Sequence, residues 1–97
     1  MGGFRRMKYD ITFSTQFKRD LKLIRKQGKD ENKLKKVIEL LANGEPLPQK
    51  YKDHNLTGNY ADCRECHIEP DWLLIYEIIE DDLILYLTRT GSHSDLF

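Results

Sequence analysis

The hydrophobic positions near the start of this chain follow first the two-residue period of a strand and then the period of a helix. Lys8 to Phe13 alternates polar and apolar residues, which predicts a first strand. Ser14 or Thr15 can cap the helix that follows, and Gly28 is suited to end it. Basic residues fill one side of this helix, and its apolar stripe consists of Phe17, Leu21 and Ile24.

A second helix is expected directly after the first. Asp30 can cap it, and Asn43-Gly44 can stop it. Its apolar stripe consists of Leu34, Val37, Ile38 and Leu41. From residue 45 to residue 60 the periodicity lapses among prolines, asparagines and glycines, which predicts a long connection with His54 in a polar loop.

The last third of the chain has the pattern of three strands. Residues 62–68 and 72–79 are β-prone runs on either side of a Glu-Pro-Asp turn, and Leu83 to Arg89 forms another run after Glu80-Asp81-Asp82. The order β-α-α-β-β-β predicts an α+β fold, with two N-terminal helices packed on a mainly antiparallel sheet.

This order allows an estimate of which residues meet across the sheet. If Glu69-Pro70 is the turn, Ile68 pairs with Asp71, and if Ile79 meets Leu83, then Asp71 comes opposite Gly91. One end of the sheet is therefore expected to gather His67, Asp71, Arg89 and His93.

Length and composition predict a single small domain. The chain has 97 residues, of which 39% are hydrophobic and 33% charged. It has no apolar run of about 18 residues, as a membrane span needs, and no signal-peptide segment, so a cytoplasmic protein is expected. We expect residues 1–6 to be a disordered or alternative-start extension and residues 7–97 to form the domain.

The net charge of zero hides a strong asymmetry. Residues 1–52 hold fourteen Lys or Arg against six Asp or Glu, whereas residues 53–97 hold two against ten. A basic face that meets a polyanion such as nucleic acid is one interpretation. Two solvated helices that happen to use lysine are the other, and charge alone leaves both open.

Cys63 and Cys66 are three residues apart, with His67 beside them. A single C-x-x-C pair is weak evidence for zinc, and residues three apart on a strand face opposite sides. We therefore expect no metal and no cofactor, and we interpret both cysteines as half-buried strand residues in a reducing compartment.

Three segments together resemble a known family. They are Tyr51-Lys52-Asp53-His54-x-Leu56-x-Gly58, then Arg64-Glu65-x-His67-x-Glu69-Pro70-Asp71-Trp72-x-Leu74-Ile75-Tyr76, and finally Arg89-Thr90-Gly91-Ser92-His93-x-x-Leu96-Phe97. In this order they resemble the YafQ branch of the RelE/ParE superfamily of bacterial toxins, over about residues 7–97. The chain departs from the family's pattern at Glu65, where an Asp is also found, and in six extra N-terminal residues.

The resemblance implies an endoribonuclease that enters the A site of the 70S ribosome and cuts mRNA. It also implies a cognate antitoxin, in a heterotetramer built on an antitoxin dimer, with operator DNA contacted only through the antitoxin, and no membrane partner. The matching catalytic positions are His54, His67, Asp71 and His93. The positions that support RNA or phosphate binding are Arg64, Trp72, Arg89 and Phe97. The basic surface for the ribosome would be Lys18, Arg19, Lys22, Lys33, Lys35 and Lys36.

These residue types suit metal-independent RNA cleavage. The reaction needs a base for the 2′-hydroxyl, an acid for the leaving 5′-oxygen and a cation for the phosphorane, and it leaves a cyclic or 3′-phosphate. Histidine, with a pKa of about 6.5, can take either proton-transfer role, and a carboxylate such as Asp71 beside an imidazole can orient it. Arg64 or Arg89 would supply the charge, and Trp72 or Phe97 a face for a base.

Other interpretations remain open at this level. His54 can be a solvated loop residue, Asp71 can simply cap a turn, and Trp72 can belong to the core. On the same fold, a ParE-like toxin that inhibits DNA gyrase by binding has no need of the histidine set. A noncatalytic RNA-binding module would use only the basic helices.

Overall fold

The structure, a computed structural model, describes residues 7–97, so the expected extension at residues 1–6 lies outside the described residues. Its helices are α1 (Thr15–Lys26), α2 (Glu31–Ala42) and α3 (His93–Leu96). Its strands are β1 (Asp10–Phe13), β2 (His54–Asn55), β3 (Arg64–Glu69), β4 (Trp72–Ile79) and β5 (Ile84–Gly91). Short 3-10 turns are η1 (Gln49–Tyr51), η2 (Gly58–Tyr60) and η3 (Glu80–Asp82). None of the described helices is long and apolar enough to cross a bilayer.

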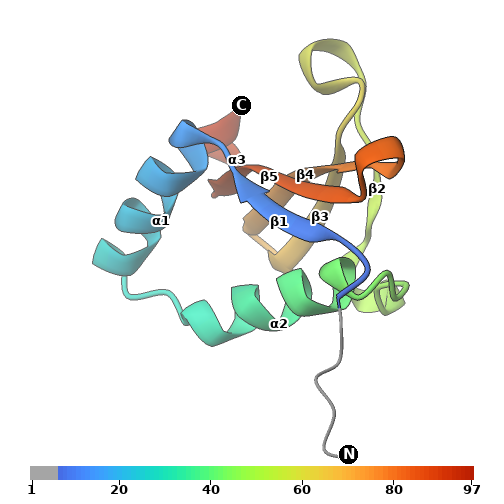
Figure 1. Cartoon of the computed structure of the whole chain (residues 1–97). Coiled ribbons are helices and arrows are strands. Elements are labelled where there is room, and N and C mark those ends of the chain that lie inside the picture. The colour runs from blue at the N-terminus through green and yellow to red at the C-terminus, as the bar shows by residue number, and fades with distance from the viewer. Residues whose placement is uncertain (1–6) are drawn as a thin grey trace, which may run out of the picture.

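The strands form one mixed sheet in the order β1-β5-β4-β3-β2 (Figure 1). β1 runs parallel to β5, and the other neighbours are antiparallel. The predicted α+β fold with two N-terminal helices is confirmed. The expected order lacked β2, because a strand of two residues is too short to show a period.

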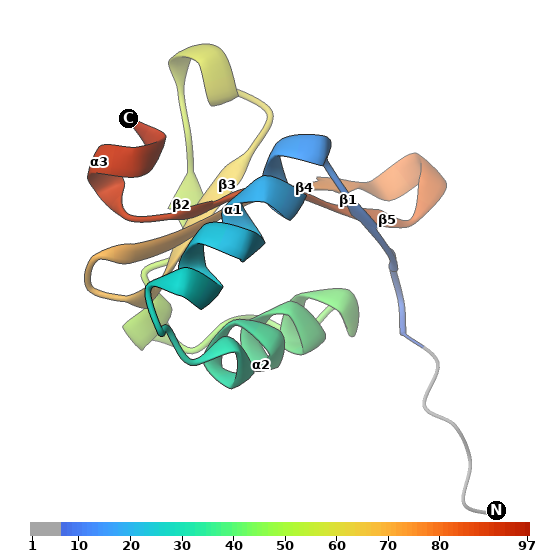
Figure 2. The same ribbon diagram turned by 90° about the vertical axis from the view of Figure 1, so that its left-hand side faces the viewer.

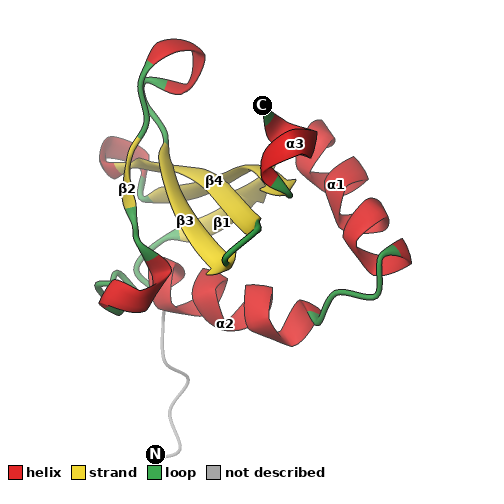
Figure 3. Cartoon of the chain, turned by 180° about the vertical axis from the view of Figure 1, so that it is seen from behind, coloured by secondary structure: helices red, strands yellow, loops and turns green. Residues whose placement is uncertain are grey.

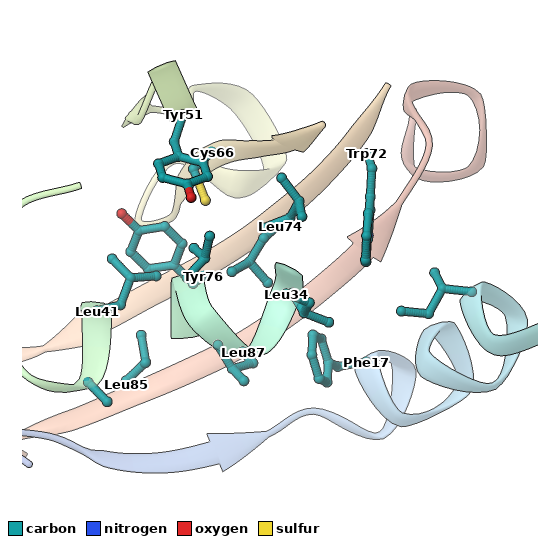
Figure 4. Close-up of a cluster of buried hydrophobic side chains, with 14 of the residues drawn as sticks. Phe17, Leu34, Leu41, Tyr51, Cys66, Trp72, Leu74, Tyr76, Leu85 and Leu87 are labelled. Carbon is teal, nitrogen blue, oxygen red and sulfur yellow. The ribbon is translucent and has the colours of Figure 1, made fainter. Parts of the chain in front are cut away.

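The two long helices begin where the sequence predicts. Ser14 caps α1 by accepting a hydrogen bond from the N–H of Phe17, and Asp30 caps α2 by accepting one from Asn32. Both helices lie on one face of the sheet, as Figures 1 and 2 show, and Figure 3 shows the chain from behind with helices in red and strands in yellow. Their apolar stripes pack in the core against the central strands. Figure 4 shows the resulting core, with side chains from α1, α2 and the central strands.

The opposite face of the sheet carries a smaller cluster, covered by α3. It consists of Cys63, Leu73, Ile75 and Leu96. Cys66, by contrast, is buried in the core on the helix face, so the two cysteines belong to different clusters. This agrees with the expectation that the two cysteines face opposite sides. Both are buried, however, instead of half-buried, and Cys63 directly precedes β3 instead of lying in it. Both thiols are free, and burial raises the pKa of each.

The predicted register of the hairpins was wrong by one residue. Glu69, not Ile68, closes the β3–β4 hairpin by pairing with Trp72, so the two turn residues are Pro70 and Asp71. This arrangement puts proline in the first central position of the turn, where its fixed φ fits best. A bulge at Ile68 absorbs the extra residue.

The β4–β5 hairpin shifts in the same way. Ile79 pairs with Ile84 instead of Leu83, whose φ of 52° places it in the turn. Leu73, instead of Asp71, then lies opposite Gly91. The expected gathering at one end of the sheet survives because a shift of one or two residues moves side chains by a few ångströms.

Candidate functional site

Strand β2 places His54 beside β3, where it pairs with Glu65. His67 is two residues further along β3 and so faces the same side of the sheet. The Glu65 side chain is only 7% exposed. Its Oε1 lies 3.4 Å from Nε2 of His54 and 3.7 Å from Nε2 of His67. The expectation that His54 sits in a polar loop was therefore wrong, because it belongs to an edge strand with a buried carboxylate as its neighbour.

The other ring nitrogen of each histidine contacts a backbone carbonyl. Nδ1 of His54 is 2.7 Å from the carbonyl oxygen of Lys52, and Nδ1 of His67 is 3.3 Å from that of Pro70. Because a carbonyl oxygen can only accept, each Nδ1 carries the hydrogen. Both imidazoles therefore present Nε2 to Glu65, with their centroids 6.5 Å apart. Each Nε2 is available to take or give a proton.

A second group of site residues lies at α3. Oδ1 of Asp71 accepts a hydrogen bond of 3.2 Å from the backbone N–H of His93, at the first position of α3. The expectation was that Asp71 would orient an imidazole, but here it holds the helix start instead. The His93 ring is exposed and lies 5.0 Å from the ring of Phe97, which in turn meets the edge of Tyr60.

The β3–β4 turn links the two groups. The carbonyl of Pro70 contacts His67, and the next residue, Asp71, contacts His93. In Figure 2 this turn and α3 lie at the same end of the sheet. His67, Asp71 and His93, which strand pairing predicted to gather at one end of the sheet, do lie around this turn. Pairing did not predict the place of His54, which β2 sets beside β3 with its ring 6.5 Å from that of His67.

Arg64 and Trp72, which were expected to contact RNA, make their polar contacts within the protein instead. All three nitrogens of the Arg64 guanidinium donate hydrogen bonds, to Asp53 and Asn55, and Arg64 pairs with Tyr76 of the helix-side core. The Trp72 side chain is fully buried, and its Nε1 donates to Thr90. Of the two interpretations of Trp72, the structure supports the core.

Phe97 and Arg89 keep positions that an RNA strand can reach. The Phe97 side chain is 58% exposed, so its ring can stack on a base. Arg89 pairs with Ile75, which belongs to the cluster on the α3 face. Its Nε and Nη2 donate to Asp20 at 2.8 and 3.1 Å, and these bonds raise the pKa of Arg89 above its ordinary value.

A basic groove of about 430 Å³ opens beside His67. Its lysines are Lys33 and Lys36 of α2 and Lys50 and Lys52 around η1. Lys33 forms an ion pair of 2.5 Å with Glu69, whose hydrogen bond raises the pKa of Lys33. The other lysines and the arginine predicted for the ribosome are exposed on the helices, outside this groove: Lys18, Arg19, Lys22 and Lys35.

Reasoning from the sequence missed some residues of this region. Glu65 could have been found, because residues two apart on a strand share a face and His67 was already a candidate. Lys50 and Lys52 gave no signal beyond the general excess of basic residues in the first half. No group of three or more His, Cys, Asp and Glu side chains among residues 7–97 is arranged to hold a metal ion.

The chain is similar to known proteins in both sequence and fold. Residues 9–97 match a family model described as the bacterial toxin of a type II toxin-antitoxin system, YafQ. The chain belongs to the YafQ family. It is 48% identical to the mRNA interferase toxin YafQ of Escherichia coli K12 over 89 residues, which cover 91% of this chain and 95% of the relative.

Solved YafQ structures are equally similar. The crystal structure of YafQ from E. coli BL21(DE3) superposes with a TM-score of 0.85 at 47% identity, covering 92% of this chain and 98% of that one. YafQ in the E. coli DinJ-YafQ toxin-antitoxin complex gives a TM-score of 0.84 at 47% identity, with 94% and 99% covered. The fold is therefore that of the solved YafQ structures.

Proposed function

We propose that this chain is an mRNA interferase, the toxin of a type II toxin-antitoxin system, which cuts mRNA in the ribosomal A site without a metal ion. The observation that carries the proposal is the buried carboxylate of Glu65 between the Nε2 atoms of His54 and His67. A ParE-like binder of gyrase or a noncatalytic RNA-binding module has no use for imidazoles arranged in this way. The similarity to the E. coli mRNA interferase toxin supports the same function.

In the mechanism we propose, one histidine deprotonates the 2′-hydroxyl, which attacks the adjacent phosphorus. A second histidine protonates the 5′-oxygen as its bond to phosphorus breaks, and a 2′,3′-cyclic phosphate remains. His54 and His93 are the proposed proton-transfer residues, and His67, better anchored on its strand, positions the phosphate. Glu65 balances the positive charge of an imidazole that has taken a proton.

Charge and base recognition complete the proposal. Arg89 contributes positive charge close to the developing phosphorane, although Asp20 offsets part of it. Phe97 offers its exposed ring to a base. Asp71 fixes the start of α3 and thereby the position of His93.

We further propose that the chain is neutralised by an antitoxin, in a heterotetramer built on an antitoxin dimer. A YafQ relative is seen in complex with the antitoxin DinJ. An apolar groove between α1 and α2 is suited to an amphipathic segment, and Lys35 at its rim is suited to an acidic residue, whereas Arg25 at the rim is already paired with Glu31. Its apolar lining consists of Phe13, Phe17, Leu21, Leu34 and Ile38.

Cleavage of mRNA on programmed ribosomes tests this function. Purified toxin is expected to cut the mRNA in the A site and to leave 5′ fragments that end in a cyclic or 3′-phosphate. Adding the product of the neighbouring antitoxin gene should stop cleavage and shift the toxin to a larger species in size-exclusion chromatography. A 3′-hydroxyl end, or inhibition of gyrase without cleavage, would contradict the proposal.

The basic groove gives a second prediction, about binding of the ribosome. Each lysine that contacts a phosphate releases about one counterion, so reversing its charge weakens binding and flattens its salt dependence. We expect Lys36→Glu together with Lys50→Glu to weaken ribosome binding at least tenfold and to lower the slope of log K against log salt by about 1.5–2. Cleavage at saturating toxin should change much less.

A matched pair of charge reversals controls for net charge. Lys8→Glu with Lys26→Glu changes the total charge equally, and neither residue lines the basic groove. If both double variants weaken binding by the same factor, the groove has no special part in ribosome binding and only the overall charge matters.

A further inference from the structure

The short strand β2 carries a candidate catalytic residue but has little backbone support. It consists of His54 and Asn55 only, and its two pairs are both with β3. Lys52, two residues before His54, has a left-handed φ of 51°. Its carbonyl accepts the hydrogen bond from Nδ1 of His54, so the direction of the imidazole depends on this backbone. Contacts other than the two residue pairs with β3 must therefore hold the backbone around His54 in place.

A network of side chains on the other face of the sheet provides that support. Asn55, Arg64 and Tyr76 form a row across β2, β3 and β4. The hydroxyl of Tyr76 donates to Oδ1 of Asp53, the residue between Lys52 and His54. Nη2 of Arg64 donates to Oδ2 of Asp53 at 2.8 Å, and Nη1 donates to the side chain of Asn55 at 2.6 Å.

Tyr76 gives this network a rigid base. Its side chain is 1% exposed and packs in the core between the sheet and the helices, where Figure 4 shows it. Burial, and then the bond to Asp53, raise the pKa of its hydroxyl, so it stays protonated and remains a donor. A hydroxyl fixed by a packed ring has little freedom, so the oxygen it holds is fixed as well.

We propose that Asp53, held by Tyr76 and Arg64, is a positioning residue that fixes His54 Nε2 relative to Glu65. Arg64 then serves the site through Asp53 and Asn55 instead of by touching a phosphate. The expected effect of this network on cleavage rests on the proposed catalytic role of His54. Its expected effect on the position of the His54 imidazole does not depend on that role.

The variant that tests it is Tyr76→Phe, which keeps the ring and removes the hydroxyl. Tyr9→Phe is the matched control, because the Tyr9 ring is also buried, at 3% exposure, and its hydroxyl also donates to a carboxylate, that of Glu80. We expect Tyr76→Phe to lower single-turnover cleavage on saturating ribosomes by about 10–100-fold, since a displacement of about 1 Å can cost that much. Tyr9→Phe should cleave at the wild-type rate, and ribosome binding should be unchanged in both.

The direct readout is nuclear magnetic resonance of the imidazole nitrogens. In the wild type, Nδ1 of His54 should carry a proton hydrogen-bonded to the Lys52 carbonyl, with Nε2 facing Glu65. Tyr76→Phe should shift the His54 signals and mix the two tautomers, whereas the signals of His67 and His93 should stay. Asp53→Asn, which keeps the shape but not the charge of the acceptor, should give a smaller shift in the same direction.

The outcomes separate the two proposals. Unchanged His54 signals in both Tyr76→Phe and Asp53→Asn would overturn the positioning role, whatever the cleavage rate. Altered His54 signals with a wild-type cleavage rate would keep the positioning role and count against catalysis by His54. Equal losses of cleavage in Tyr76→Phe and Tyr9→Phe would show a general effect of stability and would also overturn the inference.

Discussion

Replacing His54 or His93 with alanine is expected to slow single-turnover cleavage of ribosome-bound mRNA by about 10²–10⁴-fold. Losses of this size are typical when a general acid or base is removed. Because neither imidazole lies in the basic groove, binding of the ribosome should change far less. Rates measured at saturating ribosome, with binding measured separately, distinguish the two effects.

Further variants test the arrangement around Glu65. Glu65→Gln keeps the shape of the side chain but cannot balance an imidazolium, so we expect a loss of about 10–100-fold. Ser94→Ala, an exposed change next to His93 on α3, is the control for local disturbance of that helix. Folded alanine variants of both His54 and His93 that cut at the wild-type rate would show that the chemistry lies elsewhere.

Replacing Asp20 with alanine is expected to cause the largest loss of stability. The Asp20 side chain is 7% exposed, and its carboxylate accepts hydrogen bonds from the Arg89 guanidinium and from the backbone N–H of Thr90. The Thr90 hydroxyl accepts a hydrogen bond from Nε1 of Trp72 and donates one to the carbonyl of Leu73. Asp20 therefore connects α1 to both β5 and β4. Its removal leaves the guanidinium and a buried N–H without their acceptor.

We expect a decrease of roughly 2–4 kcal/mol in the free energy of unfolding, because breaking a buried pair costs about 3–5 kcal/mol and Arg89 keeps some access to water. Urea unfolding followed by circular dichroism measures it. Glu31→Ala, which breaks the exposed ion pair with Arg25, is the control and should cost about 1 kcal/mol or less. Equal losses in the two variants would mean that the buried network contributes nothing special.

Much of the fold was predictable because it depends on local order. The helical period and the capping residues Ser14 and Asp30 placed α1 and α2, and strand alternation placed the edges of β3 and β4 within a few residues. The resemblance of three short segments to the YafQ family was confirmed by the match over residues 9–97. Gathering of His67, Asp71 and His93 at one end followed from strand order, which tolerates a small error in register, whereas the place of His54 beside β3 did not.

The tertiary structure alone decided which side chains meet. The sequence by itself determined the elements, their order and the charge asymmetry, because these are properties of neighbouring residues. It did not determine that Arg64 is held by Asp53, or that Arg89 is held by Asp20, which is 69 residues away. Nor did it reveal β2, because two residues are too few to show the alternation of a strand and because β2 forms only by pairing with β3. Contacts between distant segments depend on register and packing, and a shift of one residue exchanges the faces of a strand.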